Sequence, residues 1–174
     1  MKKLKDVDYK IISALIKDSR ISDRKLAKTL GVSQPTVSRR RALLQKEKLL
    51  DFTAIPDFAK FGFEIMAFDF YSWTPEATGE LMENREEILN RLTTFLSRHK
   101  NIIFTSNGRG FGMERMMISV HKSYSDYVRL IHEVGQAWGK YLQESNSFIV
   151  SLKEDVVGRQ LTLKHLAEYI NESR

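Results

Sequence analysis

The stretch from Ile21 to Leu44 constrains this chain more than any other, and it reads ISDRKLAKTLGVSQPTVSRRRALL. Gly31 follows the apolar side chains of a first helix, where a helix ends and the backbone often needs a positive φ angle. Ser33 is a good N-cap for a second helix, and Pro35 is tolerated in a first turn because the N–H that it lacks would have had no partner there. The stretch therefore predicts two short helices joined by a tight turn.

The second of these helices, predicted over 34–47, is amphipathic. Val37 and Leu44 lie on one face, while the other faces carry short hydrogen-bonding side chains and guanidinium groups, and no acidic residue occurs from 24 to 46. Arg binds guanine edges and phosphate, Gln binds adenine, and Ser and Thr serve either role. A run of charged residues such as 39–41 is more often a solvated helix face. Because this run follows a helix and a glycine turn, we favour the interpretation that it contacts the DNA major groove. The predicted DNA-contacting residues are Ser22 and Arg24, on backbone phosphate, together with Ser33, Gln34, Thr36, Ser38, Arg39, Arg40 and Arg41.

The charge distribution agrees with a nucleic-acid-binding head. The net charge is +6, but residues 1–50 hold 14 Lys and Arg against 5 Asp and Glu, so the remainder of the chain is mildly acidic. This pattern is typical of a basic DNA-binding domain attached to a near-neutral body. There is no cysteine, which excludes disulfides, and neither a signal peptide nor a membrane-spanning run is predicted, so we expect a cytoplasmic protein.

Apolar spacing predicts a third helix ahead of the pair, from Asp6 or Asp8 to about Lys17, and the three helices would form a small bundle. Residues 49–55 (LLDFTAI) are expected to form a strand, which would add a short wing.

The pattern VDYKIISALIKDSRISDRKLAKTLGVSQPTVSRRRALLQKEKLL, followed by FTAIPDFAKFGF, resembles the leucine-responsive/asparagine-regulator (Lrp/AsnC) family of transcription factors over about the first 60 residues. The resemblance implies a winged helix-turn-helix, homodimers or higher homo-oligomers, and an α/β effector domain that binds a small molecule such as an amino acid. Two positions depart from the family pattern. Arg41 stands where members usually carry Ile or Val, and Lys48 stands where they usually carry Gly.

The rest of the chain shows strand and helix signals in the order βαββαβ. Strands are expected over 63–71, 102–106, 116–120 and 148–152, with helices over 74–99 and from Ser123 or Ser125 onward, and a last helix over 162–170. This is the split βαβ order of a ferredoxin-like domain, which the resemblance also implies as a RAM-type effector domain. The predicted fold class is thus α+β. The predicted divisions are a DNA-binding domain (1–53), a linker (54–62), an effector and dimerisation domain (63–154) and a C-terminal helical extension (155–174).

A second candidate site is the glycine-rich segment from Asn107 to Gly112, which lacks the context of a nucleotide-binding loop. The resemblance places an amino-acid effector pocket near this connection, with the family's Asp position falling on Met113 or Glu114. The residues singled out for a ligand are Gly108, Arg109, Gly110 and Glu114, although a plain hairpin or interface loop is the favoured alternative.

The four histidines are scattered without metal-ligand spacing, and no catalytic motif is present, so no metal, cofactor or enzyme activity is predicted. The sequence favours a sequence-specific transcriptional regulator that binds double-stranded DNA as a dimer or higher oligomer. The alternative is a ligand-sensing or assembly protein that packages DNA non-specifically.

Overall fold

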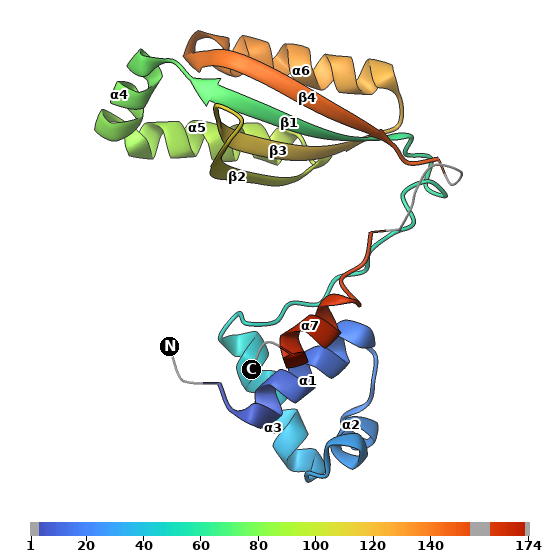
Figure 1. Cartoon of the computed structure of the whole chain (residues 1–174). Helices are drawn as coiled ribbons and strands as arrows, with labels where there is room; N and C mark the ends of the chain where they lie inside the picture. The colour runs from blue at the N-terminus through green and yellow to red at the C-terminus, as the bar shows by residue number, and fades with distance from the viewer. Residues whose placement is uncertain (1–3, 154–160, 173–174) are drawn as a thin grey trace. The chain divides into compact units, whose positions relative to one another are not determined.

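The computed structural model describes residues 4–153 and 161–172, and the chain divides into two compact units (Figure 1). The first unit consists of residues 1–55 together with residues 159–174, and the second consists of residues 56–158. Among the described helices, none is both long enough and apolar enough to cross a membrane.

Three helices form the N-terminal part of the first unit, as the sequence predicts. They are α1 (Asp6–Lys17), α2 (Asp23–Leu30) and α3 (Gln34–Lys46). Each contributes apolar side chains at helical spacing to one buried cluster: Ile11, Leu15, Leu26, Ala27, Val37 and Leu44.

The strand predicted over 49–55 is wrong, because residues 50–57 form neither helix nor strand. Leu49, Leu50 and Phe52 instead pack against the helical cluster, so their apolar character serves the core rather than a sheet. The backbone at Lys48 accounts for the glycine that the Lrp/AsnC pattern usually has at this position. Its φ is +55°, and the N–H of Leu49 donates to the Leu44 carbonyl at 2.9 Å, which is the pattern of a Schellman C-cap.

The C-terminal helix belongs to the first unit, which corrects the separate extension predicted for residues 155–174. Helix α7 (Leu166–Glu172) packs on α1 (Figure 1). Ala167 is fully buried, its carbonyl accepts a hydrogen bond of 2.8 Å from the Ser13 hydroxyl, and Glu168 lies 3.2 Å from Lys17. Residues from both ends of the chain therefore complete one helical unit.

Replacing Ala167 with glutamate is expected to release α7 and to lower the stability of this unit by about 1–3 kcal/mol, because the larger charged side chain does not fit the buried position. Thermal unfolding followed by circular dichroism measures the change. Glu168→Ala is the matched control. It removes only an exposed ion pair and should change stability by less than about 0.5 kcal/mol. Equal melting of Ala167→Glu and the wild type would contradict the assignment of α7.

The second unit confirms the predicted βαββαβ order and the α+β fold class. Its elements are β1 (Ile65–Trp73), α4 (Pro75–Glu83), α5 (Arg85–Arg98), β2 (Ile102–Gly110), β3 (Met113–His121), α6 (Tyr124–Trp138), the 3₁₀ turn η1 (Gly139–Tyr141) and β4 (Leu142–Ser151). The four antiparallel strands lie in the order β2-β3-β1-β4. The single helix predicted over 74–99 is divided at Asn84, whose non-helical backbone ends α4 and begins α5.

Helices α5 and α6 pack together on one face of the sheet. Phe95 of α5 makes an edge contact with Trp138 of α6 at 6.4 Å between ring centroids, and the Tyr127 hydroxyl of α6 donates to Asp69 of β1 at 3.1 Å. Since side chains alternate along a strand, Phe68 points to the opposite face. The strand register then places one apolar row across all four strands on that face: Phe104, Ile118, Phe68 and Phe148.

Candidate nucleic-acid interface

The turn between α2 and α3 is built from short-range hydrogen bonds. The Ser22 hydroxyl caps α2 by accepting from the Lys25 N–H at 3.2 Å, and Ser33 caps α3 by accepting from the Thr36 N–H at 3.4 Å. Gly31 ends α2 with a φ of +67°, a conformation that costs other residues more. These contacts produce the helix-turn-helix that the sequence predicts.

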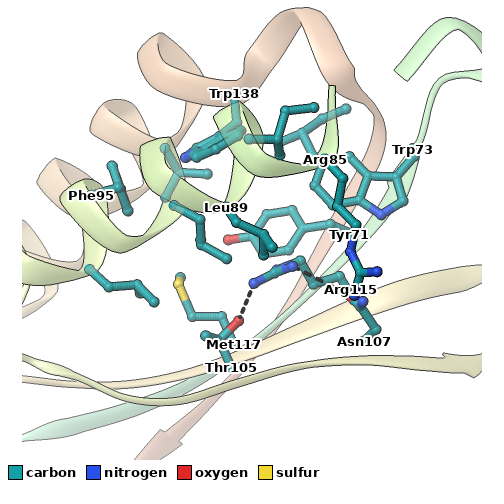
Figure 2. Close-up of a pocket in the computed structure, with 15 residues that line it drawn as sticks. Tyr71, Trp73, Arg85, Leu89, Phe95, Thr105, Asn107, Arg115, Met117 and Trp138 are labelled. Carbon is teal, nitrogen blue, oxygen red and sulfur yellow. Dashed lines mark hydrogen bonds between the residues drawn. The ribbon is translucent and has the colours of Figure 1, made fainter. Parts of the chain in front are cut away.

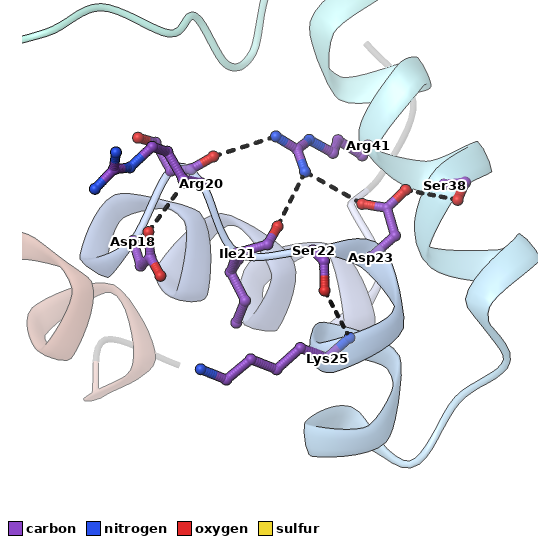
Figure 3. A network of polar contacts seen from close by, with 9 residues as sticks. Asp18, Arg20, Ile21, Ser22, Asp23, Lys25, Ser38 and Arg41 are labelled. Carbon is purple, nitrogen blue, oxygen red and sulfur yellow. Dashed lines mark hydrogen bonds and ion pairs between the residues drawn. The ribbon is translucent and has the colours of Figure 1, made fainter.

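A carboxylate clamp fixes the angle between the two helices (Figure 3). Asp23 of α2 accepts a hydrogen bond of 2.6 Å from Ser38 and lies 3.2 Å from the guanidinium of Arg41, both on α3. Arg41 also donates to the Ile21 carbonyl at 3.4 Å and stacks over the Phe52 ring. Ser38 and Arg41 are therefore occupied by contacts within the unit, and the DNA-contacting roles predicted for them stay predictions.

Arg40 is also turned inward, and the DNA contact predicted for it stays a prediction. Its guanidinium makes a two-point contact with Asp8 of α1, with Nε donating at 2.5 Å and a second nitrogen donating to the other carboxylate oxygen. Asp8 is fully buried, and the Arg40 side chain is only 16% exposed. Burial alone would raise the pKa of Asp8, but hydrogen bonds from Arg40 and from the Lys5 N–H hold that pKa below its usual value. This pair joins α1 to α3.

The outward face of α3 carries a different set of residues. Arg39 and Gln34 are exposed, and neither makes a hydrogen bond or ion pair with any residue that the structure describes. Arg39 shares its stripe with Pro35, Ala42 and Lys46, which are also exposed and recur at spacings of four, three and four residues. Small and basic side chains on one stripe let a helix approach a polyanion closely.

The remaining predicted residues lie at the two helix starts. Ser33 and Thr36 hydrogen-bond to each other through their hydroxyls at 2.8 Å, so both act first as the cap of α3. Ser22 and Arg24 are exposed at the start of α2. Lys25 and Lys28 of α2 are also exposed, and they are not among the DNA-contacting residues predicted from the sequence. Their positive charge within the helix-turn-helix is the sequence feature that could have indicated a DNA contact.

The second candidate site forms the tip of a hairpin rather than a loop. β2 continues through Gly108 and Arg109 to Gly110, which pairs with Met113, and the turn consists of Phe111 and Gly112 with φ of +54° and +75°. Glu114 accepts a hydrogen bond of 3.1 Å from the Trp73 N–H. Gly108, Arg109, Gly110 and Glu114 do not line the cavity described below, and their ligand role stays a prediction. Among the described residues, no three His, Asp or Glu side chains are grouped as a metal site requires.

Comparison with known proteins bears directly on the first unit. Residues 4–45 match the model of the AsnC-type helix-turn-helix domain. Residues 4–45 thus form an AsnC-type helix-turn-helix domain. The resemblance seen in the sequence is thereby confirmed, and the AsnC-type domain coincides with α1 to α3.

Similarity to individual proteins extends over most of the chain. An uncharacterized HTH-type transcriptional regulator of Pyrococcus furiosus, PF1734, is 27% identical over 151 residues, which cover 86% of this chain and 94% of that protein. The structure of Escherichia coli AsnC has a TM-score of 0.67 at 16% identity and covers 91% of this chain and 98% of its own. The regulator NMB0573 of Neisseria meningitidis, solved as a complex with L-Met, has a TM-score of 0.68 at 16% identity and covers 94% and 99%. At these identities the structural matches establish the shared fold of the AsnC-type domain and the α/β unit behind it.

Proposed function

We propose that this protein is a sequence-specific transcriptional regulator of the Lrp/AsnC type. The observation that carries the proposal is that Arg39, on the outward stripe of α3, and Gln34, at its first turn, are exposed and uncommitted while the inward arginines hold the helix in place. Helix α3 would lie in the major groove with Gln34 and Arg39 on base edges, since these side chains pair with adenine and guanine. Arg24, Lys25, Lys28 and Lys46 would bind backbone phosphate on either side, with Ser22 and Ser33 as weaker contacts.

The proposal includes self-association through the second unit. A single helix-turn-helix buries little surface on DNA, and dimers double the contact by binding two half-sites. The apolar row on the sheet supports this role, because Phe104 is 49% exposed and Phe148 is 67% exposed, although both side chains are large and apolar. Exposed apolar patches of this kind mark interfaces between proteins.

Phe148→Asp is expected to convert the proposed dimer to a monomer, because it places a charge at the most exposed end of the apolar row, on the edge strand β4, without touching the core on the helix face. Sedimentation velocity measures the mass in solution. Tyr124→Asp is a matched control, since Tyr124 is 61% exposed and lies at the start of α6 on the other side of the sheet. A Phe148→Asp protein with the wild-type mass would refute this interface.

We further propose that an amino acid modulates assembly, acting near the hairpin residues predicted from the family resemblance. The complex of NMB0573 with L-Met supports the ligand class, because that protein shares the fold. An effector of this kind would act through the equilibrium between assembly states rather than at the DNA surface.

Footprinting on genomic DNA fragments tests the proposed function against non-specific packaging. Discrete protected sites that recur in several fragments are expected from a regulator, because base contacts discriminate between sequences. Uniform protection that grows along every fragment with protein concentration would favour packaging and overturn the proposal.

A further inference from the structure

A cavity of about 330 Å³ lies between α5 and the sheet in the second unit (Figure 2). This volume is at the lower end of the range for small-molecule sites. Most of the wall is apolar and much of it is aromatic, with Trp73, Phe95 and Trp138 contributing rings. Among the described residues that line it, none is Asp or Glu.

A cation stands in this apolar wall without a carboxylate partner. Arg115 points from β3 into the cavity and is only partly exposed, and none of the described residues forms an ion pair with it (Figure 2). Its guanidinium donates to the Asn107 side-chain oxygen and to the Thr105 hydroxyl, each at 3.1 Å. These two bonds fix its orientation and leave three of its five N–H donors uncommitted.

Beside Arg115 lies a buried hydroxyl with no hydrogen-bond partner. Tyr71, which pairs with Arg115 across β1 and β3, is 5% exposed, and its hydroxyl is unsatisfied among the described residues. Burial raises the pKa of this hydroxyl, so it stays protonated and can donate. Burying a hydrogen-bond donor without an acceptor costs folding free energy. Because this donor belongs to a residue that lines a cavity, we expect a bound ligand to supply the acceptor.

Arg85 places a second positive charge at the same cavity. It lies at the start of α5, lines the cavity and forms no ion pair with a described residue (Figure 2). Two guanidinium groups and a hydroxyl donor, with no Asp or Glu among the described lining residues, make a site that attracts one anionic group and offers no carboxylate to a ligand's ammonium group.

We propose that the cavity between α5 and the sheet binds a small hydrophobic monocarboxylic acid without an α-amino group. The carboxylate pairs with Arg115 and accepts from the Tyr71 hydroxyl, while the apolar body packs against the aromatic wall. The site differs in place and in ligand class from the amino-acid site proposed at the hairpin. Ligand binding to this cavity can be measured without DNA, so the test does not depend on the proposed DNA-binding function.

Calorimetric titration of the full-length protein with 3-phenylpropionate tests the proposal, using two analogues that each change one feature. We expect one molecule to bind per chain, with a dissociation constant on the order of 1 mM or tighter for a ligand of this size. L-phenylalanine adds an ammonium group and 3-phenylpropanamide removes the charge, so each should bind at least about tenfold more weakly. Absence of binding at about 10 mM 3-phenylpropionate, or equal binding of the three compounds, would overturn the proposal.

Variants separate the cavity from other basic surfaces. Arg115→Met should weaken binding at least about tenfold while the melting temperature changes little, because the two hydrogen bonds lost are offset by removal of a half-buried cation that has no carboxylate partner among the described residues. Arg98→Met, at the exposed end of α5 and outside the cavity lining, should bind like the wild type. Leu89→Trp enlarges a side chain that lines the cavity and should abolish binding with Arg115 intact. Equal losses in Arg98→Met and Arg115→Met, or full binding by Leu89→Trp, would contradict the site.

Discussion

Replacing Arg40 with alanine is expected to unfold the first unit, which is the largest effect that the structure predicts for a single substitution. The change leaves Asp8 as a buried carboxylate without its cation, and loss of one partner from a buried ion pair costs about 3–5 kcal/mol. A unit of about 70 residues has a total stability of the same size. Helical circular dichroism during thermal unfolding should show loss of an early transition, while the second unit still melts.

A double substitution distinguishes loss of the pair from general damage. Asp8→Leu together with Arg40→Met replaces both charges with apolar side chains and should recover most of the stability that Arg40→Ala removes. The low pKa of Asp8 also fixes the sign of the pH dependence. The pair contributes fully above about pH 4, and its contribution is lost as the pH falls through the lowered pKa of Asp8. A wild-type melting profile for Arg40→Ala would show that the pair is dispensable.

Arg39→Ala is expected to leave the fold intact and to weaken specific DNA binding by about 1–3 kcal/mol, or roughly 5- to 150-fold. Arg39 is exposed and makes no hydrogen bond or ion pair within the described part of the chain, so its removal should cost the fold little, whereas a guanidinium on guanine contributes energy and selectivity. Fluorescence anisotropy with a duplex from the footprinting experiment measures the affinity. The change should also relax preference at one base pair.

The next position on the same exposed stripe of α3, Ala42, supplies the control for this prediction. Ala42→Ser alters the same exposed stripe without removing charge and should retain near wild-type affinity. If Arg39→Ala binds the same duplex as tightly as the wild type does, α3 does not use this residue in the groove, and the proposed docking face is wrong.

The helix boundaries of the first unit follow from local signals, and the sequence predicts them well. Ser22, Gly31 and Ser33 determine the ends of α2 and α3 through contacts within four residues, so the sequence is sufficient. The roles of the three consecutive arginines depend on residues far away in the chain. Arg40 turns inward because it binds Asp8, which lies 32 positions earlier in the chain. Arg41 turns inward because it contacts Asp23 and the Phe52 ring.

Two other features of the structure differ from what the sequence predicts. The largely apolar segment 49–55 predicts a strand, but Leu50 and Phe52 pack against the helical cluster of the first unit. The sequence does not predict a role for the cavity residue Arg115, because nothing in its sequence neighbourhood distinguishes it. Its role follows from its pairing with Tyr71 across two strands and from the lack of Asp or Glu among the described residues that line the cavity.

If α3 recognises DNA sequence, the protein must distinguish two duplexes that have the same composition and different base order. The affinity of the full-length protein is compared between a footprinted duplex and a scrambled duplex of the same composition over a range of salt concentrations. We expect the footprinted duplex to bind at least about 10³-fold more tightly, with affinity for both duplexes falling steeply as salt rises. Equal affinity for the two duplexes at every salt concentration would contradict sequence-specific recognition by this helix.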